Sequence, residues 1–263
     1  MSRVALVTGG ARRIGLAIAT RLAKEGYELV LTYHRDAESA RKAVPELLGA
    51  GARNVHLVGV DLAQPASRGL LLARTLELTG RLDLLVNSAA LFEYDHALSV
   101  SSARLDRHLQ TNFVAPTELT LAWARLREAT GEKAPGHVVT LLDQKLDNLN
   151  PDYCSYTLSK LAAGASIRFL AQTCAPWLRV NAVSPGVTMP TDGMSSEDFQ
   201  AARNVAALGK SSTPQDIAEA VWALEQLRAV TGQTLAVDGG QHLVPRRRDV
   251  AFPERPLFSG DPA

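Results

Sequence analysis

Two short motifs, far apart in the chain, hold residues that could do chemistry together. The first is Thr8–Gly15, a glycine-containing turn that directly follows the apolar run Val4–Val7. The second places Tyr156 and Lys160 four residues apart, which puts both side chains on one face of a helix. A free phenol is a poor acid–base catalyst at neutral pH, and a nearby ammonium eases its proton transfer. Together the motifs indicate a redox enzyme that binds a dinucleotide and protonates its substrate through Tyr156.

The glycine turn is of the kind that holds phosphates. Gly9 and Gly15 permit a tight bend, and a helix predicted to start at Ile14 would offer N–H groups and the positive end of its dipole to a pyrophosphate. The spacing is Gly-x-x-x-Arg-x-Gly, so Arg13 stands where a middle glycine is expected. An ordinary strand-to-helix turn is the alternative. Cofactor contacts are predicted for Gly9, Arg12, Arg13, Ile14 and Gly15.

The end of the second predicted strand indicates which dinucleotide is bound. An acidic residue there would bind the ribose diol of NADH, whereas Tyr33, His34 and Arg35 suit the 2′-phosphate of NADPH. We therefore favour NADPH, although Asp36 follows directly and a solvated basic loop is the alternative.

A third cofactor position follows the third predicted strand. Asp61 and Leu62 are placed to contact adenine. A helix cap formed by Asp61 is the competing interpretation.

Short apolar runs alternate with longer amphipathic ones along the chain, which predicts a parallel sheet wound on both faces. Strands are expected at Val4–Val7, Glu28–Thr32, Asn54–Val60, Leu82–Val86, His137–Leu142, Arg179–Val183 and Gln233–Val237. Helices are expected at Ile14–Glu25, Ala37–Gly49, Ser67–Thr79, Val100–Thr130, Tyr153–Ala175 and Thr213–Ala229. The prediction is one α/β domain over 1–244 and a tail over 245–263. The stretch 186–210 is either a lid over the substrate or an ordinary long loop.

Composition excludes several other classes of protein. The 263 residues are 46% hydrophobic and carry a net charge of +1, which gives no electrostatic case for nucleic acid or membrane. Two cysteines are too few for a disulfide framework, and no metal site is expected. No stretch approaches the roughly 18 apolar residues of a membrane span. We expect a cytoplasmic protein.

The motifs and their order resemble the short-chain dehydrogenase/reductase family over the whole chain to about Val244. The matching segments are Thr8–Gly15, Asp61-Leu62, Asn87-Ser88-Ala89-Ala90, Asn112, Tyr156 with Lys160, Ser184-Pro185-Gly186 and Val237-Asp238-Gly239-Gly240. The resemblance implies a single Rossmann-fold domain with a doubly wound, seven-stranded parallel sheet and helices on both faces. It also implies a homotetramer.

The family's residue roles carry over by position. By this resemblance Tyr156 is the acid–base, while Lys160 holds the nicotinamide ribose and lowers the pKa of the tyrosine. Asn112 would anchor a proton-relay water. The remaining cofactor contacts would come from Asn87, Ser88, Ala89, Pro185, Gly186, Val187 and Thr188.

One departure from the family bears on the substrate. The family usually has a serine thirteen residues before the tyrosine, and this chain has Asp143 there. A carboxylate would repel a developing alkoxide, which argues against simple ketone reduction. It could instead accept hydrogen bonds from an amidine-like heterocycle or help to protonate a ring nitrogen. A disabled site in a non-enzymatic relative is the other interpretation.

Asp143, Arg13 and Phe92 together resemble the pteridine reductase branch, which includes the dihydromonapterin reductases. That resemblance implies that Phe92 stacks on a pterin and that Arg13 contacts both pterin and cofactor phosphate. Asp143 and Tyr156 would manage the proton, and the four residues would form the substrate site. On chemistry alone, Phe92 could be a packed loop aromatic and Arg13 a phosphate contact only.

The sequence thus predicts an NADPH-dependent reductase that converts a dihydropterin, such as dihydromonapterin or dihydrobiopterin, to its tetrahydro form. The alternatives are a general NADPH-dependent carbonyl or imine reductase and a nucleotide-binding sensor without turnover. In a tetramer, Arg246–Arg248 could reach a neighbour's pocket and meet an anionic substrate group, although a solvated basic tail is the plainer expectation.

Overall fold

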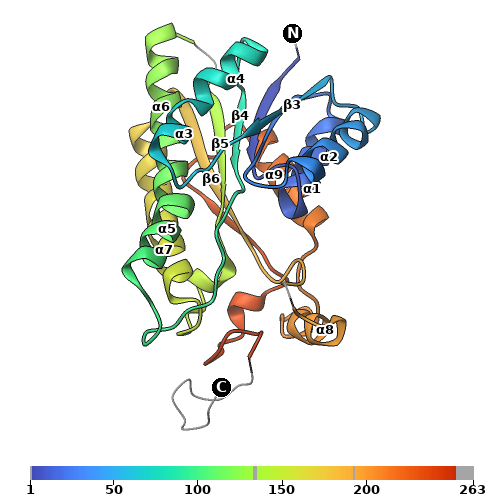
Figure 1. Ribbon diagram of the computed structural model, residues 1–263, viewed down its shortest axis with the longest axis vertical. Helices are drawn as coiled ribbons and strands as arrows, with labels where there is room; N and C mark the ends of the chain where they lie inside the picture. Colours follow the sequence, from blue (N-terminus) through green and yellow to red (C-terminus); the bar gives the residue numbers. More distant parts are fainter. Residues whose placement is uncertain (1, 133–134, 192, 253–263) are drawn as a thin grey trace.

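A computed structural model of the chain describes residues 2–132, 135–191 and 193–252. Its centre is a sheet of seven strands, all parallel, in the order β3-β2-β1-β4-β5-β6-β7 (Figure 1). The predicted fold class is confirmed. The strands are β1 Val4–Thr8, β2 Glu28–Tyr33, β3 Asn54–Gly59, β4 Leu84–Asn87, β5 Gly136–Leu141, β6 Leu178–Pro185 and β7 Thr234–Val237.

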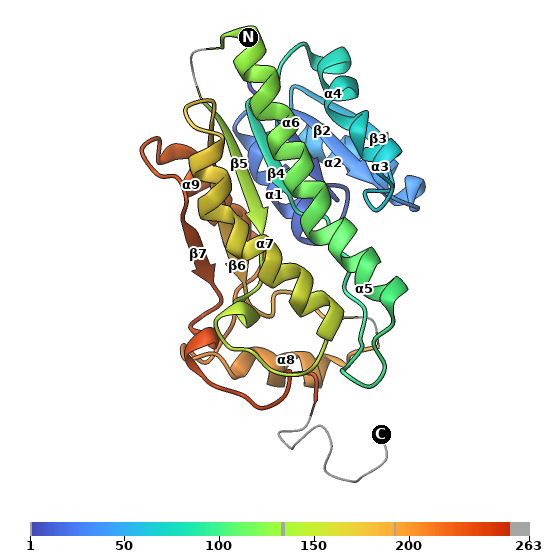
Figure 2. The same cartoon turned by 90° about the vertical axis from the view of Figure 1, so that its left-hand side faces the viewer.

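Helices cover both faces of this sheet, as Figures 1 and 2 show. One face packs against α1 (Arg13–Lys24), α2 (Ala37–Gly49) and α9 (Pro214–Gln226). The other packs against α4 (Leu71–Thr79), α6 (Ala115–Thr130) and α7 (Cys154–Thr173). Because the central strands are covered twice, β1, β4, β5 and β6 are buried along their whole length. This double burial explains the continuous apolar run of β1, whereas β5 and β6 also bury polar side chains such as His137 and Asn181.

Two predicted helices are interrupted in the structure. The helix expected over Ser67–Thr79 consists of α3 (Pro65–Gly69) and α4. The helix expected over Val100–Thr130 consists of α5 (Ser102–Leu109), a π-helical segment (Gln110–Val114) and α6. Pro116 explains the second interruption, because it lacks the N–H that a regular α-helix would direct at the carbonyl of Asn112. In the π segment the N–H of Ala115 bonds the carbonyl of Gln110, five residues back.

The stretch 186–210 contains a helix that the sequence analysis missed, α8 (Ser196–Asn204). Ser195 caps it by accepting a hydrogen bond from the N–H of Asp198. In Figure 1, α8 and the C-terminal segment gather below the carboxyl ends of the strands. In open parallel sheets this edge is where ligands bind, at the point where strand order reverses between β1 and β4.

Candidate active site

The structure brings the three central candidate residues together at the carboxyl end of β5. Tyr156 Oη donates a hydrogen bond of 2.7 Å to Oδ2 of Asp143. Lys160, one turn further along α7, donates from Nζ to the carbonyl of Leu141 at 2.6 Å. Both α7 side chains are buried, whereas Asp143 keeps some exposed surface. The sequence spacing therefore predicted a real cluster.

Burial sets the protonation state of this cluster. It raises the pKa of Asp143, and it raises the pKa of Tyr156 well above 10, with the neighbouring charge of Asp143 adding to the second effect. Burial also lowers the pKa of Lys160 to about 8. The expected lowering of the tyrosine pKa by Lys160 is therefore not found, because burial and Asp143 act in the opposite direction. Tyr156 is a neutral phenol that holds its proton at neutral pH.

The start of α7 is fixed from outside the helix. Tyr153, at the N-cap position, has a φ of 55° and no side-chain capping bond. The fully buried Asp95 takes that role, because its carboxylate accepts hydrogen bonds from the N–H and the hydroxyl of Ser155. Asp95, in the loop that follows β4, thus fixes the start of α7 and with it the positions of Tyr156 and Lys160.

Asn112 lies in the π-helical segment and links two elements of the site. Its Oδ1 accepts from the N–H of Leu91 at 2.7 Å, and its Nδ2 donates to the carbonyl of Leu91 and to Ser159 Oγ, both at 2.9 Å. Since the side-chain amide is fully engaged with protein groups, it acts as a brace between the β4 loop and α7. The relay water remains a prediction, and it would have to use the main chain of Asn112.

The phosphate turn has the shape of an anion cradle. Gly9 has a φ of +62°, and a Cβ there would lie 3.1 Å from the Cα of Ala89. A Cβ on Gly15 would collide with the carbonyl oxygen of Gly9. The N-terminus of α1 has no side-chain cap, since Arg12 makes no capping bond, so its N–H groups point toward the turn. These glycines and this helix start fit a dinucleotide pyrophosphate.

Arg13 adopts the backbone conformation of the glycine that it replaces. Its φ is 52°, in the left-handed region that costs a non-glycine residue about 1–2 kcal/mol. Its guanidinium donates to the carbonyl of Pro190 at 2.9 Å, in the stretch after β6. The strained backbone therefore carries a side chain that spans from the phosphate turn to the predicted substrate loop.

The residues predicted to select NADPH lie at the exposed end of β2. The carboxylate of Asp36 caps α2 by accepting a hydrogen bond of 2.9 Å from the N–H of Ser39. His34 and Arg35 are exposed, and Tyr33 is partly buried.

The predicted adenine contacts have partners within the protein. Asp61 Oδ1 accepts from the N–H of Ala63, and Oδ2 lies 3.6 Å from Nε2 of His34. Asp61 therefore caps its own turn and faces the candidate 2′-phosphate site at the same time. Leu62 is buried in the core, which leaves only its main chain for a cofactor contact.

Two further segments with predicted cofactor contacts are held in place by hydrogen bonds. Thr8 Oγ1 accepts hydrogen bonds from the N–H groups of Ser88 and Ala89, which fixes the chain after Asn87 against the phosphate turn. On the other side, Gln241 Oε1 accepts from the N–H of Val187 at 3.1 Å. A Cβ on Gly186 would crowd Asp238 and Gln241, so the segment from Pro185 to Thr188 follows a tightly packed path.

Phe92 lies beside the catalytic candidates. Its ring meets Tyr156 edge-on, with centroids 4.7 Å apart, and stacks on Tyr153 at 4.3 Å. The side chain is still 42% exposed, so one part of the ring remains open to a ligand. The packed aromatic is therefore observed, and stacking of Phe92 on a substrate remains a prediction.

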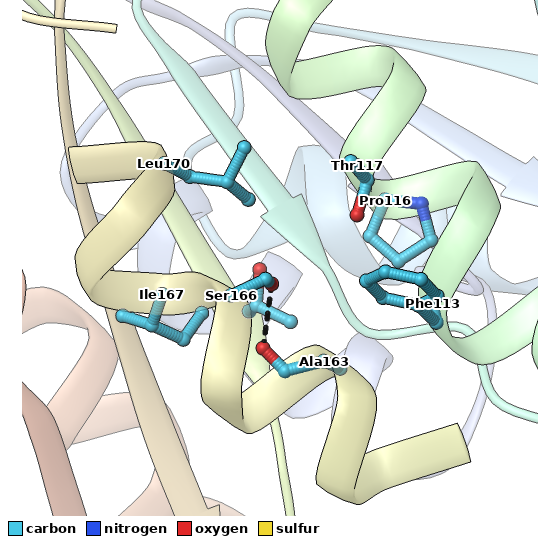
Figure 3. Close-up of a pocket in the computed structure, with 8 residues that line it drawn as sticks. Phe113, Pro116, Thr117, Ala163, Ser166, Ile167 and Leu170 are labelled. Atoms are coloured by element: carbon cyan, nitrogen blue, oxygen red, sulfur yellow. Dashed lines mark hydrogen bonds between the residues drawn. The ribbon is translucent and has the colours of Figure 1, made fainter. Parts of the chain in front are cut away.

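A separate cavity lies between the π segment, α6 and α7 (Figure 3). Phe113, Pro116 and Thr117 line one side, and Ala163, Ser166, Ile167 and Leu170 line the other. Its volume of about 10 Å³ is at the limit for a single water molecule. This cavity cannot hold a substrate and is a packing gap beside the site.

Several residues of the site were missed by the sequence analysis. Tyr153, Asp95 and Ser159 position α7 and the aromatic ring above it, and Lys145 and Asp152 lie in the connection between Asp143 and α7. Only Tyr153 carried a signal, as an aromatic residue three positions before Tyr156. In the described part of the chain, no group of histidine, cysteine or carboxylate side chains could hold a metal ion.

Comparison with known proteins identifies the family. A family model described as enoyl-(acyl carrier protein) reductase matches residues 9–242. The chain belongs to the short-chain dehydrogenase/reductase family. A relative from Streptomyces violaceoruber, named for a ketoacyl reductase of the granaticin polyketide synthase, is 34% identical over 252 residues, which cover 92% of this chain and 96% of the relative.

Two solved structures are similar over nearly their whole length. FolM alternative dihydrofolate reductase 1 from Brucella canis, complexed with NADP, is 36% identical with a TM-score of 0.82, covering 92% of this chain and 94% of that one. A short-chain dehydrogenase from Burkholderia cenocepacia, also in complex with NADP, is 29% identical with a TM-score of 0.81, covering 91% and 97%. The predicted cofactor, NADPH/NADP, agrees with the ligand of both structures. No helix among the described residues is long and apolar enough to cross a membrane.

Proposed function

We propose that this oxidoreductase reduces a dihydropterin to the tetrahydropterin with NADPH. The observation that carries the proposal is the hydrogen bond of Tyr156 to Asp143 beside the half-exposed ring of Phe92. A hydroxyl at position 143 would suit a ketone, whereas a carboxylate suits a heterocycle with N–H donors.

The cofactor would lie across the crevice at the strand reversal. Gly9, Gly15 and the start of α1 would hold its pyrophosphate, His34 and Arg35 its 2′-phosphate, and Lys160 its nicotinamide ribose. When bound, NADPH supplies a hydride to the carbon of a ring C=N bond. The adjacent ring nitrogen then gains the electron pair of that bond and requires a proton.

Tyr156 and Asp143 would supply this proton as a coupled pair. Burial raises the pKa of both groups, and it keeps the Tyr156 hydroxyl protonated at neutral pH. Loss of the Tyr156 proton beside an ionised Asp143 would place two negative charges 2.7 Å apart. We therefore infer that a proton from solvent must reach the pair as Tyr156 protonates the substrate, so that Tyr156 and Asp143 never carry two negative charges.

Three other features favour a pterin. Phe92 offers an open aromatic ring for a flat, electron-poor heterocycle. Arg13 spans the crevice with a guanidinium that can donate to both phosphate and a ring oxygen. The similar structure from Brucella canis is named a dihydrofolate reductase, and the substrate of that enzyme class contains a dihydropterin ring.

A general carbonyl reductase is the second candidate, because the Streptomyces violaceoruber relative is named for a ketoacyl reductase. The two functions differ in what they require of position 143. Asp143→Ser should impair pterin reduction and raise ketone reduction if Asp143 recognises the heterocycle.

Assembly as a homotetramer remains part of the proposal. Two large apolar side chains of α7, Leu158 and Phe169, are exposed in the single chain. A symmetric partner could cover them.

NADPH oxidation tests the function directly. The protein is assayed with 7,8-dihydromonapterin, 7,8-dihydrobiopterin and dihydrofolate against a panel of ketones and cyclic imines. Turnover confined to dihydropterins is the expected result. Turnover of ketones alone would replace the proposal with the carbonyl reductase, and NADPH binding without any turnover would indicate a sensor.

A further inference from the structure

The C-terminal segment folds back onto its own chain beside the candidate site. Arg248 donates from Nε and from a terminal guanidinium nitrogen to the two carboxylate oxygens of Asp152, each at 2.8 Å. The N–H of Asp249 donates to the same carboxylate at 2.8 Å. Asp152 is fully buried and Arg248 is 7% exposed. Figure 2 shows this red segment beside the yellow-green connection that leads into α7.

Further bonds hold the segment along the whole connection between Asp143 and α7. Asn148 donates to the carbonyl of Val244 at 2.7 Å and accepts from the N–H of Arg246 at 3.3 Å. Lys145 Nζ donates to the carbonyl of Asp152 at 2.6 Å and lies 3.4 Å from the carboxylate of Asp249. The segment is therefore a bound element of the domain.

Aromatic contacts continue from this segment to the catalytic candidate. The ring of Phe252 lies 5.0 Å from that of Tyr94 and 6.2 Å from that of Tyr153, measured between centroids. Tyr153 stacks on Phe92, which in turn meets Tyr156. The C-terminal segment thus supports the ring against which a flat substrate would lie.

The positive side chains of this region, Lys145 and Arg248, are more deeply buried than the negative side chain of Asp249. The side chains of Lys145 and Arg248 are 4% and 9% exposed, whereas Asp249 keeps 19% of its surface. After burial, the charge of Asp249 is the largest cause that raises the pKa of Tyr153 to about 12. The same charge adds to the raised pKa of Asp143 and of Tyr156. Lys145, 3.4 Å away, partly offsets the charge of Asp249, and the remainder acts on the candidate site.

We propose that residues 245–252 close the substrate site of their own chain, with Arg248 as the positioning residue and Asp249 as a specificity-determining residue that disfavours anionic substrates. The proposal rests on the proposed function for its substrate. It reverses the sequence-based expectation for Arg248, whose guanidinium is committed to Asp152 of the same chain and is not available to an anionic group. Substrates with a neutral or cationic, N–H-rich edge would enter, and those with an added carboxylate would be opposed.

Charge selectivity is tested with two substrates that share a ring. Dihydrobiopterin has a neutral side chain, whereas dihydrofolate carries glutamate carboxylates. Asp249→Asn keeps the acceptor for the N–H of Ala251 and removes the charge. We expect it to raise kcat/KM for dihydrofolate relative to dihydrobiopterin by about three- to fivefold, mainly through KM. The matched control is Asp147→Asn, an exposed carboxylate in the same connection. An equal change for both substrates, or an equal shift in the control, would overturn the role of Asp249.

Two readouts separate this proposal from the proposed function. The ratio of dissociation constants for biopterin and folate, measured on the NADP-loaded protein, reports charge selectivity without turnover. Hydrogen exchange of the amides at 148–155 and 245–252 reports the anchor. Arg248→Gln should speed this exchange at least tenfold, and Arg41→Gln, at an exposed position of α2, should not. Unchanged exchange in Arg248→Gln would refute the closure in cis. Faster exchange in Arg248→Gln, together with a wild-type protein that reduces no pterin, would support the closure by residues 245–252 and refute the proposed function.

Discussion

Two largely buried carboxyl groups at opposite ends of the sheet have pKa values that are shifted in opposite directions. Asp143 follows the carboxyl end of β5, and Glu225 closes the end of α9 against the amino ends of the strands. Burial raises the pKa of Asp143, whose direct hydrogen-bond donors, Tyr156 and the N–H of Lys145, are neutral. Burial also opposes ionisation of Glu225, but its cationic and hydrogen-bonding neighbours keep its pKa below the ordinary value.

The neighbours of Glu225 account for the difference. Its carboxylate lies 2.8 Å from Nδ1 of His137 and 3.3 Å from both Arg179 and Arg228. Arg179 also donates to several main-chain carbonyls, so the cluster is closely hydrogen-bonded on both sides. A carboxylate matched by cations is held ionised and supports the fold, whereas burial among neutral donors shifts the balance toward the protonated form. The direction of the shift, rather than burial itself, distinguishes the two ends.

Mutation of the charged cluster around Glu225, at the amino ends of the strands, should cause the largest loss of stability. Glu225→Gln removes the charge that compensates buried Arg179, and we expect the free energy of unfolding to fall by about 3–5 kcal/mol. Urea unfolding measures the loss, and turnover per folded molecule should be unchanged. Glu128→Gln, at an exposed position of α6, is the control and should change neither quantity. If Glu225→Gln kept its stability but lost activity, Glu225 would have a role in catalysis and not in the stability of the fold.

At the carboxyl end, removal of one hydroxyl should act on turnover alone. Tyr156→Phe deletes the proton donor, and we expect kcat to fall about 10²-fold or more while NADPH still binds. Tyr27→Phe is the counterpart at the other end, because its hydroxyl lies 3.4 Å from Glu225. That variant should keep full turnover with a small loss of stability. Steady-state rates and fluorescence titration with NADPH measure both, and near-normal turnover in Tyr156→Phe would remove Tyr156 from the mechanism.

Arg35, at the carboxyl ends of the strands, should affect cofactor binding, whereas Arg179, at the amino ends, supports stability. Arg35 is exposed at the end of β2, so Arg35→Ala should leave stability unchanged. It should weaken NADPH binding by roughly 1.5–3 kcal/mol, and NADH binding far less, because only NADPH carries a 2′-phosphate. Calorimetric titration with each cofactor, with exposed Arg41→Ala as control, measures this. Equal losses for the two cofactors would refute the 2′-phosphate role.

What the sequence could predict depends on how local the contacts are. The phosphate turn and the Tyr156–Lys160 pair are contiguous, so spacing predicted the parallel sheet and the shared helix face, whereas the strand order was not predicted. The interruption at Pro116 was readable in principle, because proline removes a helical bond that its position specifies. The divided helices were mispredicted because apolar periodicity continues through them.

The substrate side could not be predicted in the same way. The anchor of the C-terminal segment joins Arg248 to a residue 96 positions earlier, and no periodicity links the two. Similarly, Asp95 caps α7 across 60 positions, in place of a capping residue next to the helix. Tyr153 and Arg13 are non-glycine residues with positive φ, which tertiary packing and not local preference imposes. Loops that meet only in the fold therefore determine what the site recognises.

Acid sensitivity gives the finest test of the two carboxyl groups. The folded-state pKa of Glu225 is lowered, so its contribution to stability is present above its unfolded pKa of about 4.3 and is lost as the pH falls through the folded value. The folded-state pKa of Asp143 is raised, so its contribution is full below about 3.9 and is lost as the pH rises through the folded value. Unfolding free energy is therefore measured against pH for the wild type and two variants. Asp143→Asn should gain stability relative to the wild type as the pH rises from 4 toward neutrality, and Glu225→Gln should lose its deficit as the pH falls below 4. Parallel pH profiles for the two variants would show that the folded-state pKa values of Asp143 and Glu225 are not shifted in opposite directions.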